Sequence, residues 1–211
     1  PVSVVAIGAG NRTSKYLEYV RTNPDKVKLV GVVELNDIRR NHVAEQFGLT
    51  ESQCFTDYKD FFRQEKEADA VMVCTPENMH FEPCMLAIEA GYHILLEKPI
   101  APTLEECQAI GKAAREKGVI VAVCHVLRYG PYFMAMREAI KRGMIGDIVS
   151  VQHLEPIQYS HMAHSYVRGN WRSSKQTTPI ILAKSCHDLD ILRWMIGKPC
   201  ETIAAEGSLH L

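Results

Sequence analysis

The sequence predicts an α/β fold whose N-terminal part is a doubly wound parallel sheet. Through the first 124 residues, short apolar runs alternate with helical stretches, which is the pattern of strand–helix–strand units. A Gly-x-Gly sequence follows the first apolar run directly, as in dinucleotide-binding turns. The alternation stops after His125, which predicts a second structural unit. We therefore divide the chain into residues 1–124, a dinucleotide-binding unit, and residues 125–211, a substrate-binding unit.

Composition excludes several functional classes. The 211 residues carry a net charge of −1, so no basic surface points to nucleic acid or to an acidic membrane. No apolar run approaches the ~20 residues that cross a bilayer, and the N-terminus lacks the basic region of a signal peptide. The seven cysteines include no Cys-x-x-Cys pair, which is typical of reduced thiols. We expect a cytoplasmic protein that binds neither nucleic acid nor a membrane.

The first strand, the glycine turn and the helix after them predict a phosphate-binding site. Residues 2–7 form an apolar run typical of a buried parallel strand, and helical residues continue to Val20. The glycines allow a tight turn, and the backbone amides at the helix start attract a diphosphate. We assign to this cofactor site Gly8, Gly10, Asn11 and Arg12. Thr13 replaces the third glycine, and its branched side chain is expected to push the helix from the strand and to loosen diphosphate binding.

An acid ends the second predicted strand, residues 27–34, and indicates which cofactor binds. A carboxylate at this point accepts hydrogen bonds from a ribose 2′-hydroxyl and repels a 2′-phosphate, so Glu34 favours NAD over NADP. Arg39 and Arg40 follow closely and keep NADP open. An ordinary solvated charge is the plainer interpretation of Glu34.

A charged tripeptide ends the strand predicted within residues 91–100. Glu97, Lys98 and Pro99 lie at the carboxyl end of a strand, where open α/β sheets bind their ligands. A lysine there is held on a rigid element and pinned by the proline. The plainer interpretation is a strand exit with solvated charges.

Turn and capping signals predict the remaining elements. In the first unit, further strands are expected at residues 53–55, 69–74 and 119–124, and helices over residues 37–47, 78–90 and 103–118. In the second unit, we expect a helix over 131–141, an antiparallel strand over 147–155, a polar loop over 159–172, a helix over 180–196 and a strand over 201–211. The last strand would leave an unprotected sheet edge, so we expect further chain beyond it.

Together these motifs resemble the Gfo/Idh/MocA family, which includes glucose–fructose oxidoreductase and inositol dehydrogenase. The matching pieces are the glycine turn, Cys74-Thr-Pro76 with His80, Glu97-Lys98-Pro99, Gly146-Asp-Ile-Val149 and the helical residues 181–190. The resemblance implies a Rossmann domain and a C-terminal α/β domain with a large open, mostly antiparallel sheet, which is incomplete here. It also implies cofactor contacts from Thr75, Pro76, His80, Glu97 and Lys98.

The resemblance implies hydride transfer between a pyridine nucleotide and a hydroxyl-bearing carbon of a sugar or cyclitol. Lys98 and His187 then act at the reacting hydroxyl, with His187 as the general base or acid. The family's Asp-x-x-x-His pair is altered, because Ala183 stands at the aspartate position. The neighbouring Lys184 can supply a hydrogen bond but no negative charge, so His187 is expected to stay neutral. We expect Lys98 and Lys184 to grip the hydroxyl together.

Polar and aromatic side chains of the second unit are expected to contact the substrate. Hydroxyl, imidazole, guanidinium and indole groups over residues 159–172 suit sugar hydroxyls and ring faces. The predicted substrate contacts are Arg128, Tyr159, His164, Arg168, Trp171 and Asp188. Helix packing is the plainer alternative for Arg128, as is a solvated helix surface for Asp188. His161 and His164 have the spacing of a metal pair, but no acid or cysteine nearby completes a ligand set, so no metal is predicted.

Two other functions stay open on the sequence. A glycoside hydrolase of the same family, which oxidises its substrate transiently with bound NAD, needs the same residues but produces no net NADH. A non-catalytic dinucleotide sensor is the second, and the presence of Lys98 and His187 argues against it. We favour an oxidoreductase with a small sugar or polyol substrate, which forms a homo-oligomer through the C-terminal sheet.

Overall fold

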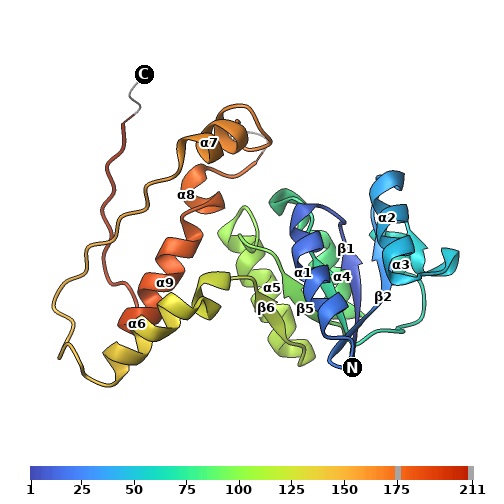
Figure 1. Ribbon diagram of the computed structural model, residues 1–211, viewed down its shortest axis with the longest axis horizontal. Coiled ribbons are helices and arrows are strands. Elements are labelled where there is room, and N and C mark those ends of the chain that lie inside the picture. Colours follow the sequence, from blue (N-terminus) through green and yellow to red (C-terminus); the bar gives the residue numbers. More distant parts are fainter. Residues whose placement is uncertain (174–176, 209–211) are drawn as a thin grey trace.

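The structure, a computed structural model, describes residues 1–173 and 177–208 (Figure 1). Its N-terminal part holds a six-stranded, all-parallel sheet in the order β3-β2-β1-β4-β5-β6. The strands are β1 (Val2–Ile7), β2 (Val27–Val33), β3 (Cys54–Phe55), β4 (Ala70–Val73), β5 (His93–Leu96) and β6 (Val121–Val123). The order reverses between β1 and β4, which is the switch point where doubly wound sheets bind nucleotides. The parallel sheet predicted from the sequence is confirmed.

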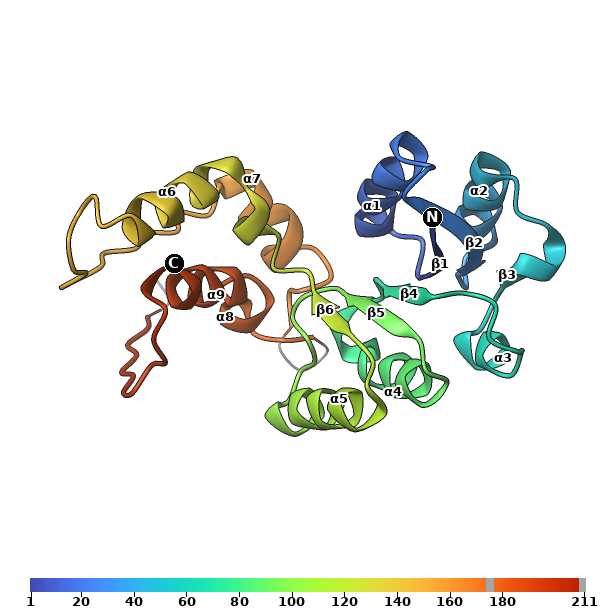
Figure 2. The ribbon, with the colours of Figure 1, turned by 90° about the horizontal axis from the view of Figure 1, so that it is seen from below.

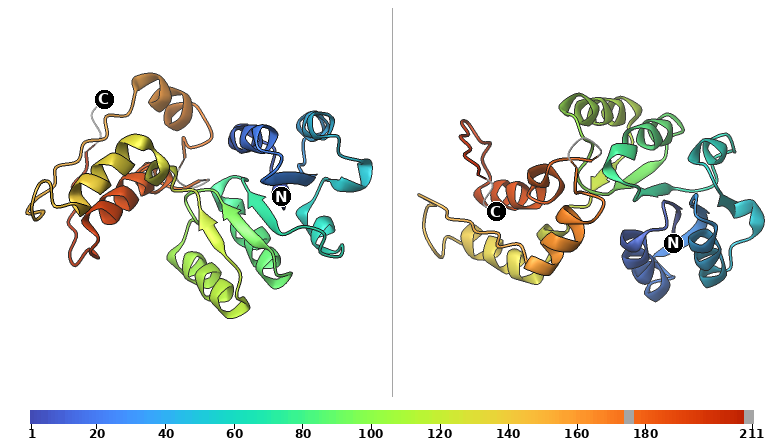
Figure 3. Two further views of the ribbon diagram at one scale, coloured as in Figure 1. Left: turned by 60° about the horizontal axis from the view of Figure 1, so that its bottom comes forward. Right: turned by 90° about the horizontal axis from the view of Figure 1, so that it is seen from above.

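Strand β1 is central because it is apolar on both faces. Successive side chains of a strand point to opposite faces, so Val5 and Ile7 pack into one core while Val4 and Ala6 pack into the other. Figure 3 shows the two layers of helices that cover these faces. The second core is closed by α1 (Asn11–Thr22) and α2 (Asp37–Phe47). The first is closed by α3 (Tyr58–Phe62), α4 (Phe81–Glu89) and α5 (Leu104–Lys117).

The helix ends follow the capping signals of the sequence. Thr103 and Glu106 form the predicted capping box before α5, and the helix ends at Gly118 in the left-handed conformation. The side chain of Asn36 accepts a hydrogen bond from the Arg39 amide at the start of α2. The short helix α3 and the 3₁₀ turns η1 (Glu51–Gln53) and η2 (Glu77–Met79) were not predicted.

The regular elements that the structure describes in the second part of the chain are all helical. Its elements are η3 (Val126–Tyr129), α6 (Pro131–Lys141), α7 (Tyr159–His161), the π-helical η4 (Met162–Val167), α8 (Ile180–Ala183) and α9 (Cys186–Ile196). Helices α6 and α9 lie side by side (Figure 2), and the Arg137 guanidinium stacks 4.2 Å from the ring centre of Trp194. The helix predicted over residues 180–196 is interrupted after Ala183, and the loop predicted over 159–172 contains α7 and η4.

Two predicted strands do not form among the described residues. Residues 147–155 and 201–208 run without strand pairing, and residues 209–211 lie outside the described part. A strand persists only when its backbone N–H and C=O groups pair with a neighbour, and no described strand lies beside either segment. The large antiparallel sheet expected for the second unit is therefore not confirmed. Over the described ranges, no helix has the length and apolar character needed to cross a membrane.

Candidate functional site

The candidate site lies at the carboxyl edge of the parallel sheet. The loops after β1, β4, β5 and β6 meet there, and α8 and α9 approach from the second part of the chain (Figure 1). A hydrogen bond joins the two parts here. The Nζ of Lys98, in the loop after β5, donates to the Ala183 carbonyl oxygen at the end of α8, at 2.7 Å. The edge expected to bind ligand is thus faced by the helix expected to carry the catalytic histidine.

The glycine turn is built for close approach. Gly8 has a φ of +88°, and a Cβ placed on it would lie 3.0 Å from the Cys74 carbonyl oxygen, so only glycine fits. A Cβ on Gly10 would meet nothing within 4 Å, so the chain itself leaves the space beside the start of α1 open. Gly10 also offers no capping side chain to the first amides of that helix. This open helix start fits an anion such as a diphosphate.

Thr13 is accommodated inside this turn. Its side chain is fully buried, and its hydroxyl donates a 2.7 Å hydrogen bond to the Gly8 carbonyl oxygen. The sequence predicted that a branched residue here would push α1 from β1. The hydrogen bond gives the Thr13 hydroxyl a partner within the turn. Leu17 of the same helix is buried in the core beside the sheet.

Glu34 closes the turn from the end of β2. Its Oε2 accepts a 2.6 Å hydrogen bond from the Ala9 amide, and its Oε1 accepts one of 2.9 Å from the Asn36 amide. Each carboxylate oxygen retains a second lone pair for a ribose hydroxyl. Arg40 is turned inward, because its guanidinium donates to the Glu34 carbonyl oxygen and pairs with Asp37.

Glu97, which follows β5, makes its contacts with other groups of the protein. This buried carboxylate accepts hydrogen bonds from the Tyr16 hydroxyl and, at 2.9 Å, from the Lys98 amide. The guanidinium of Arg12, predicted to contact the cofactor, lies 3.4 Å from Glu97. Burial, with hydrogen bonds to Cys124 and Glu97, raises the pKa of Tyr16. Glu97 therefore fixes the strand end that carries Lys98.

His80, predicted to contact the cofactor, is buried instead between two loops. Its Nδ1 lies 3.0 Å from the Pro99 carbonyl oxygen and its Nε2 lies 2.9 Å from the Thr75 carbonyl oxygen. Both ring nitrogens are thus engaged by backbone. His80 links the loop after β4, which includes Thr75 and Pro76, to the loop after β5, and so positions both.

His187 lies in a buried, electropositive setting. Burial first, and then the charges of Lys98, His125 and Lys184, lower its pKa to about 4. Its Nδ1 is buried and makes no hydrogen bond to a described residue. The direction agrees with the prediction that His187 stays neutral without an aspartate at position 183. A neutral imidazole in this place can accept a proton from a substrate hydroxyl.

His125 is a site residue that the sequence analysis missed. It follows Cys124 in the loop after β6, and its ring meets that of His187 edge to face, with the ring centres 5.9 Å apart. Its Nδ1 lies 3.9 Å from Asp190, and burial lowers its pKa. Its position at the carboxyl end of a parallel strand was the signal that could have identified it.

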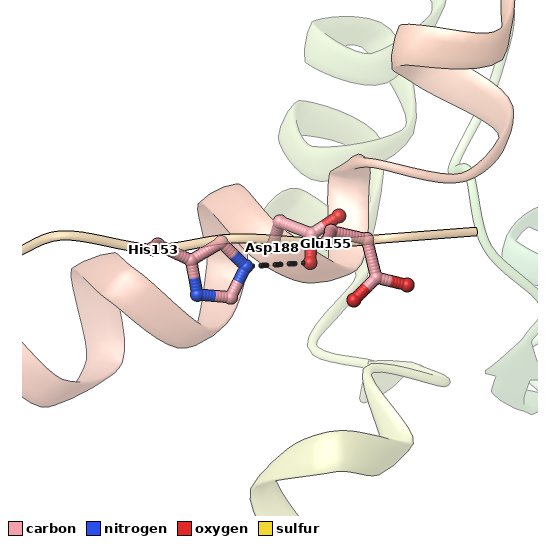
Figure 4. A group of neighbouring side chains, drawn as sticks. All are labelled: His153, Glu155 and Asp188. Carbon is pink, nitrogen blue, oxygen red and sulfur yellow. Dashed lines mark hydrogen bonds and ion pairs between the residues drawn. The ribbon is translucent and has the colours of Figure 1, made fainter.

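Asp188 has a partner on the segment before α7 (Figure 4), and Lys184 has one there as well. The Lys184 ammonium lies 2.5 Å from Oε1 of Glu155, and the Nε2 of His153 lies 2.9 Å from Oδ1 of Asp188. Ligand atoms of His153, Glu155 and Asp188 all lie within 4.8 Å of one another, so these residues are a possible metal-ligand set that the sequence did not indicate. Since the Lys184 ammonium already supplies the positive charge beside Glu155, we describe the group as an ion-pair network.

The residues predicted to contact the substrate divide into two sets. Arg128 is held by two hydrogen bonds to the Asp190 carboxylate, of 2.8 and 2.5 Å, and Asp188 is held by His153, so both have partners within the second part of the chain. Tyr159 is 84% exposed at the start of α7. His164, Arg168 and Trp171 instead line one common cavity of about 570 Å³.

A second tie between the two parts runs through Glu77 of η2. This carboxylate, 3% exposed, accepts a 2.8 Å hydrogen bond from Nε1 of Trp171. It also accepts hydrogen bonds of 3.3 and 3.1 Å from the amide and hydroxyl of Thr178. Glu77 follows Pro76, so the loop after β4 holds the wall of the cavity. No sequence signal separated this acid from an ordinary one at a helix start.

Comparison with known proteins agrees with this geometry. Residues 2–125 match the Gfo/Idh/MocA model, described as an oxidoreductase family with an NAD-binding Rossmann fold, and residues 137–208 match its C-terminal α/β domain. The chain belongs to the Gfo/Idh/MocA oxidoreductase family. The resemblance seen in the sequence is thereby confirmed, and with it an α/β domain after the Rossmann domain.

Several relatives of this chain are named for sugars or inositols. The 1,5-anhydro-D-fructose reductase of Ensifer adhaerens is 35% identical over 145 residues, which is 67% of this chain and 42% of the relative. The scyllo-inositol 2-dehydrogenase (NAD(+)) of Bacillus subtilis is 26% identical over 208 residues, which is 99% of this chain and 58% of the relative. The crystal structure of myo-inositol 2-dehydrogenase from Lactobacillus plantarum has the same fold, with a TM-score of 0.82 and 22% identity over 93% of this chain and 57% of that one. The chain spans about half the length of these relatives.

Proposed function

We propose that this protein is an NAD(P)-dependent oxidoreductase that transfers a hydride between the nicotinamide and a hydroxyl-bearing carbon of a sugar, cyclitol or related polyol. The observation that carries the proposal is the meeting of Lys98 with the α8–α9 segment. Its ammonium lies 2.7 Å from the Ala183 carbonyl oxygen, and its charge helps to lower the pKa of His187 to about 4. A fixed cation beside a neutral imidazole is the pair that alcohol oxidation requires.

The cofactor site is assigned to the glycine turn and the end of β2. Gly8 and Gly10 leave room for a diphosphate at the start of α1, where Asn11 and Arg12 supply the first backbone amides. Glu34 is positioned beside the turn to receive a ribose hydroxyl, which supports NAD. When bound, the nicotinamide supplies the hydride acceptor or donor.

The proton is assigned to His187. In the oxidation direction its neutral ring accepts the proton of the substrate hydroxyl, while Lys98 stabilises negative charge on that oxygen. Lys184 contributes through its charge, because its ammonium is held by Glu155 and helps to keep His187 neutral. We assign Thr75, Pro76 and His80 to the wall of the cofactor crevice, with His80 as a positioning residue.

Absorbance at 340 nm tests this function. The full-length gene product is mixed with NAD⁺ or NADP⁺ and a panel of inositols, sugars and sugar acids. The variant Lys98→Met should abolish the rise in absorbance, while Lys112→Met, on the exposed side of α5, should leave it unchanged. Silence with every substrate, although NADH binds, would contradict the oxidoreductase and favour the NAD-cycling hydrolase or the sensor.

We further propose that residues 125–211 belong to a unit that completes an antiparallel sheet and forms a homo-oligomer in the cytoplasm. Support comes from apolar side chains on the two unpaired segments, where Val149 is 96% exposed and Ile203 is 80% exposed. Such exposed residues on unpaired chain are typical of strands that find partners elsewhere. Light scattering of the full-length protein measures the assembly, and a monomer would contradict it.

A further inference from the structure

We propose that the cavity lined by His164, Arg168 and Trp171 binds an anionic group of the substrate, a carboxylate or a phosphate. The proposal rests on the oxidoreductase function proposed above and narrows its substrate to an acidic sugar or polyol. It assigns to this chain a binding site for a charged substituent, apart from the carbon that exchanges the hydride.

The lining of the cavity is suited to an anion. The cavity has a volume of about 570 Å³, enough for a carboxylate or phosphate and the adjoining sugar carbons. Its lining consists of Ser160, Ala163, His164, Ser165, Arg168, Gly169, Asn170 and Trp171. None of these residues is acidic, whereas hydroxyl, amide, imidazole and guanidinium groups all offer hydrogen-bond donors.

Arg168 is available for a ligand. Its guanidinium forms no ion pair with a described residue, in contrast to Arg128, which is fully engaged by Asp190. A second guanidinium, that of Arg172, donates a 3.3 Å hydrogen bond to the Gly169 carbonyl oxygen in the cavity wall. A planar guanidinium forms paired hydrogen bonds with carboxylate and phosphate groups, and these bonds are stronger than those to neutral hydroxyls.

The cavity wall is fixed by close packing of its backbone. A Cβ on Gly169 would lie 2.3 Å from the His164 carbonyl oxygen, so the chain turns back on itself too tightly for any side chain there. Trp171 packs against Tyr166, with the ring centres 6.3 Å apart. The groups that face an anion are therefore presented by a constrained segment.

The wall is also tied to the hydride-transfer site. Nε1 of Trp171 donates a 2.8 Å hydrogen bond to Glu77, which follows β4, and β4 pairs directly with β5, the strand that carries Lys98 at its end. Glu77 is an acid that contacts a residue of the cavity wall. Its carboxylate accepts hydrogen bonds from Trp171 and Thr178. The wall of the cavity is thus connected through Glu77 to the strand next to the one that carries Lys98.

Fluorescence of Trp171 tests binding without any turnover. The 211 residues contain two tryptophans, and the variant Trp194→Phe removes the one that does not line the cavity. The full-length protein is titrated at constant ionic strength with glucuronate, glucose 6-phosphate, inorganic phosphate and neutral glucose. We expect the acidic compounds to change the emission at concentrations at which glucose does not. Isothermal titration of the wild-type protein replaces this assay if Trp194→Phe does not fold.

Arginine variants connect that binding to the cavity. Arg168→Gln should weaken binding of the acidic sugar about tenfold or more, because one charge-assisted interaction is lost. Arg142→Gln, on the exposed residue after α6, should change it less than about twofold. A stronger response to glucuronate than to glucose 6-phosphate and phosphate identifies a carboxylate site, and the reverse identifies a phosphate site. Equal binding of glucose and the acids, or no effect of Arg168→Gln, would overturn the proposal.

Turnover assays test the anion-binding site and the proposed oxidoreductase activity separately. Oxidation of acidic sugars with loss of kcat/KM in Arg168→Gln supports both proposals. Equal oxidation of neutral and acidic substrates would overturn the anion site and leave the oxidoreductase standing. Binding of acids through Arg168 without any oxidation would support the site and overturn the oxidoreductase.

Discussion

The Lys98 ammonium donates a 2.7 Å hydrogen bond to the backbone carbonyl oxygen of Ala183. The family resemblance implies an aspartate at position 183, and Ala183 supplies no carboxylate there. The absence of that negative charge, together with burial, is consistent with the low pKa of His187, about 4. The imidazole is therefore neutral at physiological pH and ready to accept a proton.

A carboxylate at position 183 should change the pH dependence of turnover. The variant Ala183→Asp is expected to raise the pKa of His187 towards its usual range, because a nearby negative charge stabilises the imidazolium. The acid limb of the pH–rate profile should then move to higher pH, since the base form of His187 is lost earlier on acidification. Ala183→Asn, which has a similar size and no charge, should leave the limb in place. Equal shifts in both variants would show that the effect is steric.

His187 should also make folding sensitive to acid. Its pKa is about 4 in the folded protein against a usual 6.5, so the unfolded chain binds a proton between these values that the folded protein does not. The contribution of His187 to the free energy of unfolding is therefore full above pH 6.5 and is lost as the pH falls to 4. Urea titrations at several pH values in this range give the free energy of unfolding, and its increase with pH should be smaller for His187→Gln than for the wild-type protein. An unchanged increase would mean that His125 and the carboxylates dominate.

The two glycines of the turn should respond differently to alanine. Gly8→Ala should destabilise the protein by about 1–3 kcal/mol, because its φ is +88° and its Cβ would lie 3.0 Å from the Cys74 carbonyl oxygen. Gly10→Ala should leave stability nearly unchanged, since a Cβ there meets nothing within 4 Å, but it should weaken NADH binding by entering the space assigned to the diphosphate. Thermal unfolding and NADH fluorescence measure the two effects. Normal NADH binding by Gly10→Ala would place the diphosphate elsewhere.

Glu77 should stabilise the junction between the two parts of the chain. Glu77→Ala leaves the buried donors of Trp171 and Thr178 without a partner, which should cost about 1–3 kcal/mol for each donor left unsatisfied. Glu77→Gln keeps an acceptor oxygen and should recover part of the loss. Glu82→Ala, which removes an exposed carboxylate from α4, serves as the control and should cost much less, because solvent screens its ion pair with Lys59. Chemical denaturation of the three variants compares them, and equal effects at positions 77 and 82 would contradict this role.

Much of the Rossmann unit was predictable, because its signals are local. Apolar runs predicted the parallel strands, and the capping box at Thr103 with the glycine at 118 predicted α5 to the residue. The strands predicted over residues 147–155 and 201–211 have no pairing partner within the described residues, since an alternating pattern shows which face a strand would bury and not whether a partner lies beside it. The helix over 180–196 was predicted as continuous, but it is interrupted where the Ala183 carbonyl meets Lys98.

The sequence by itself determined the parallel sheet, the glycine turn and the place of Lys98 at the carboxyl end of a strand. Only the tertiary structure decided which polar groups from distant parts of the chain contact one another. Arg128 meets Asp190 across 62 residues, Lys98 meets Ala183 across 85, and Trp171 meets Glu77 across 94. Helix and strand periods act between neighbours along the chain, so they carry no information on such distant pairs. Those contacts arise when helices and strands pack together, and packing decided that Arg128 and Asp188 pair with Asp190 and His153 while Arg168 lines a cavity.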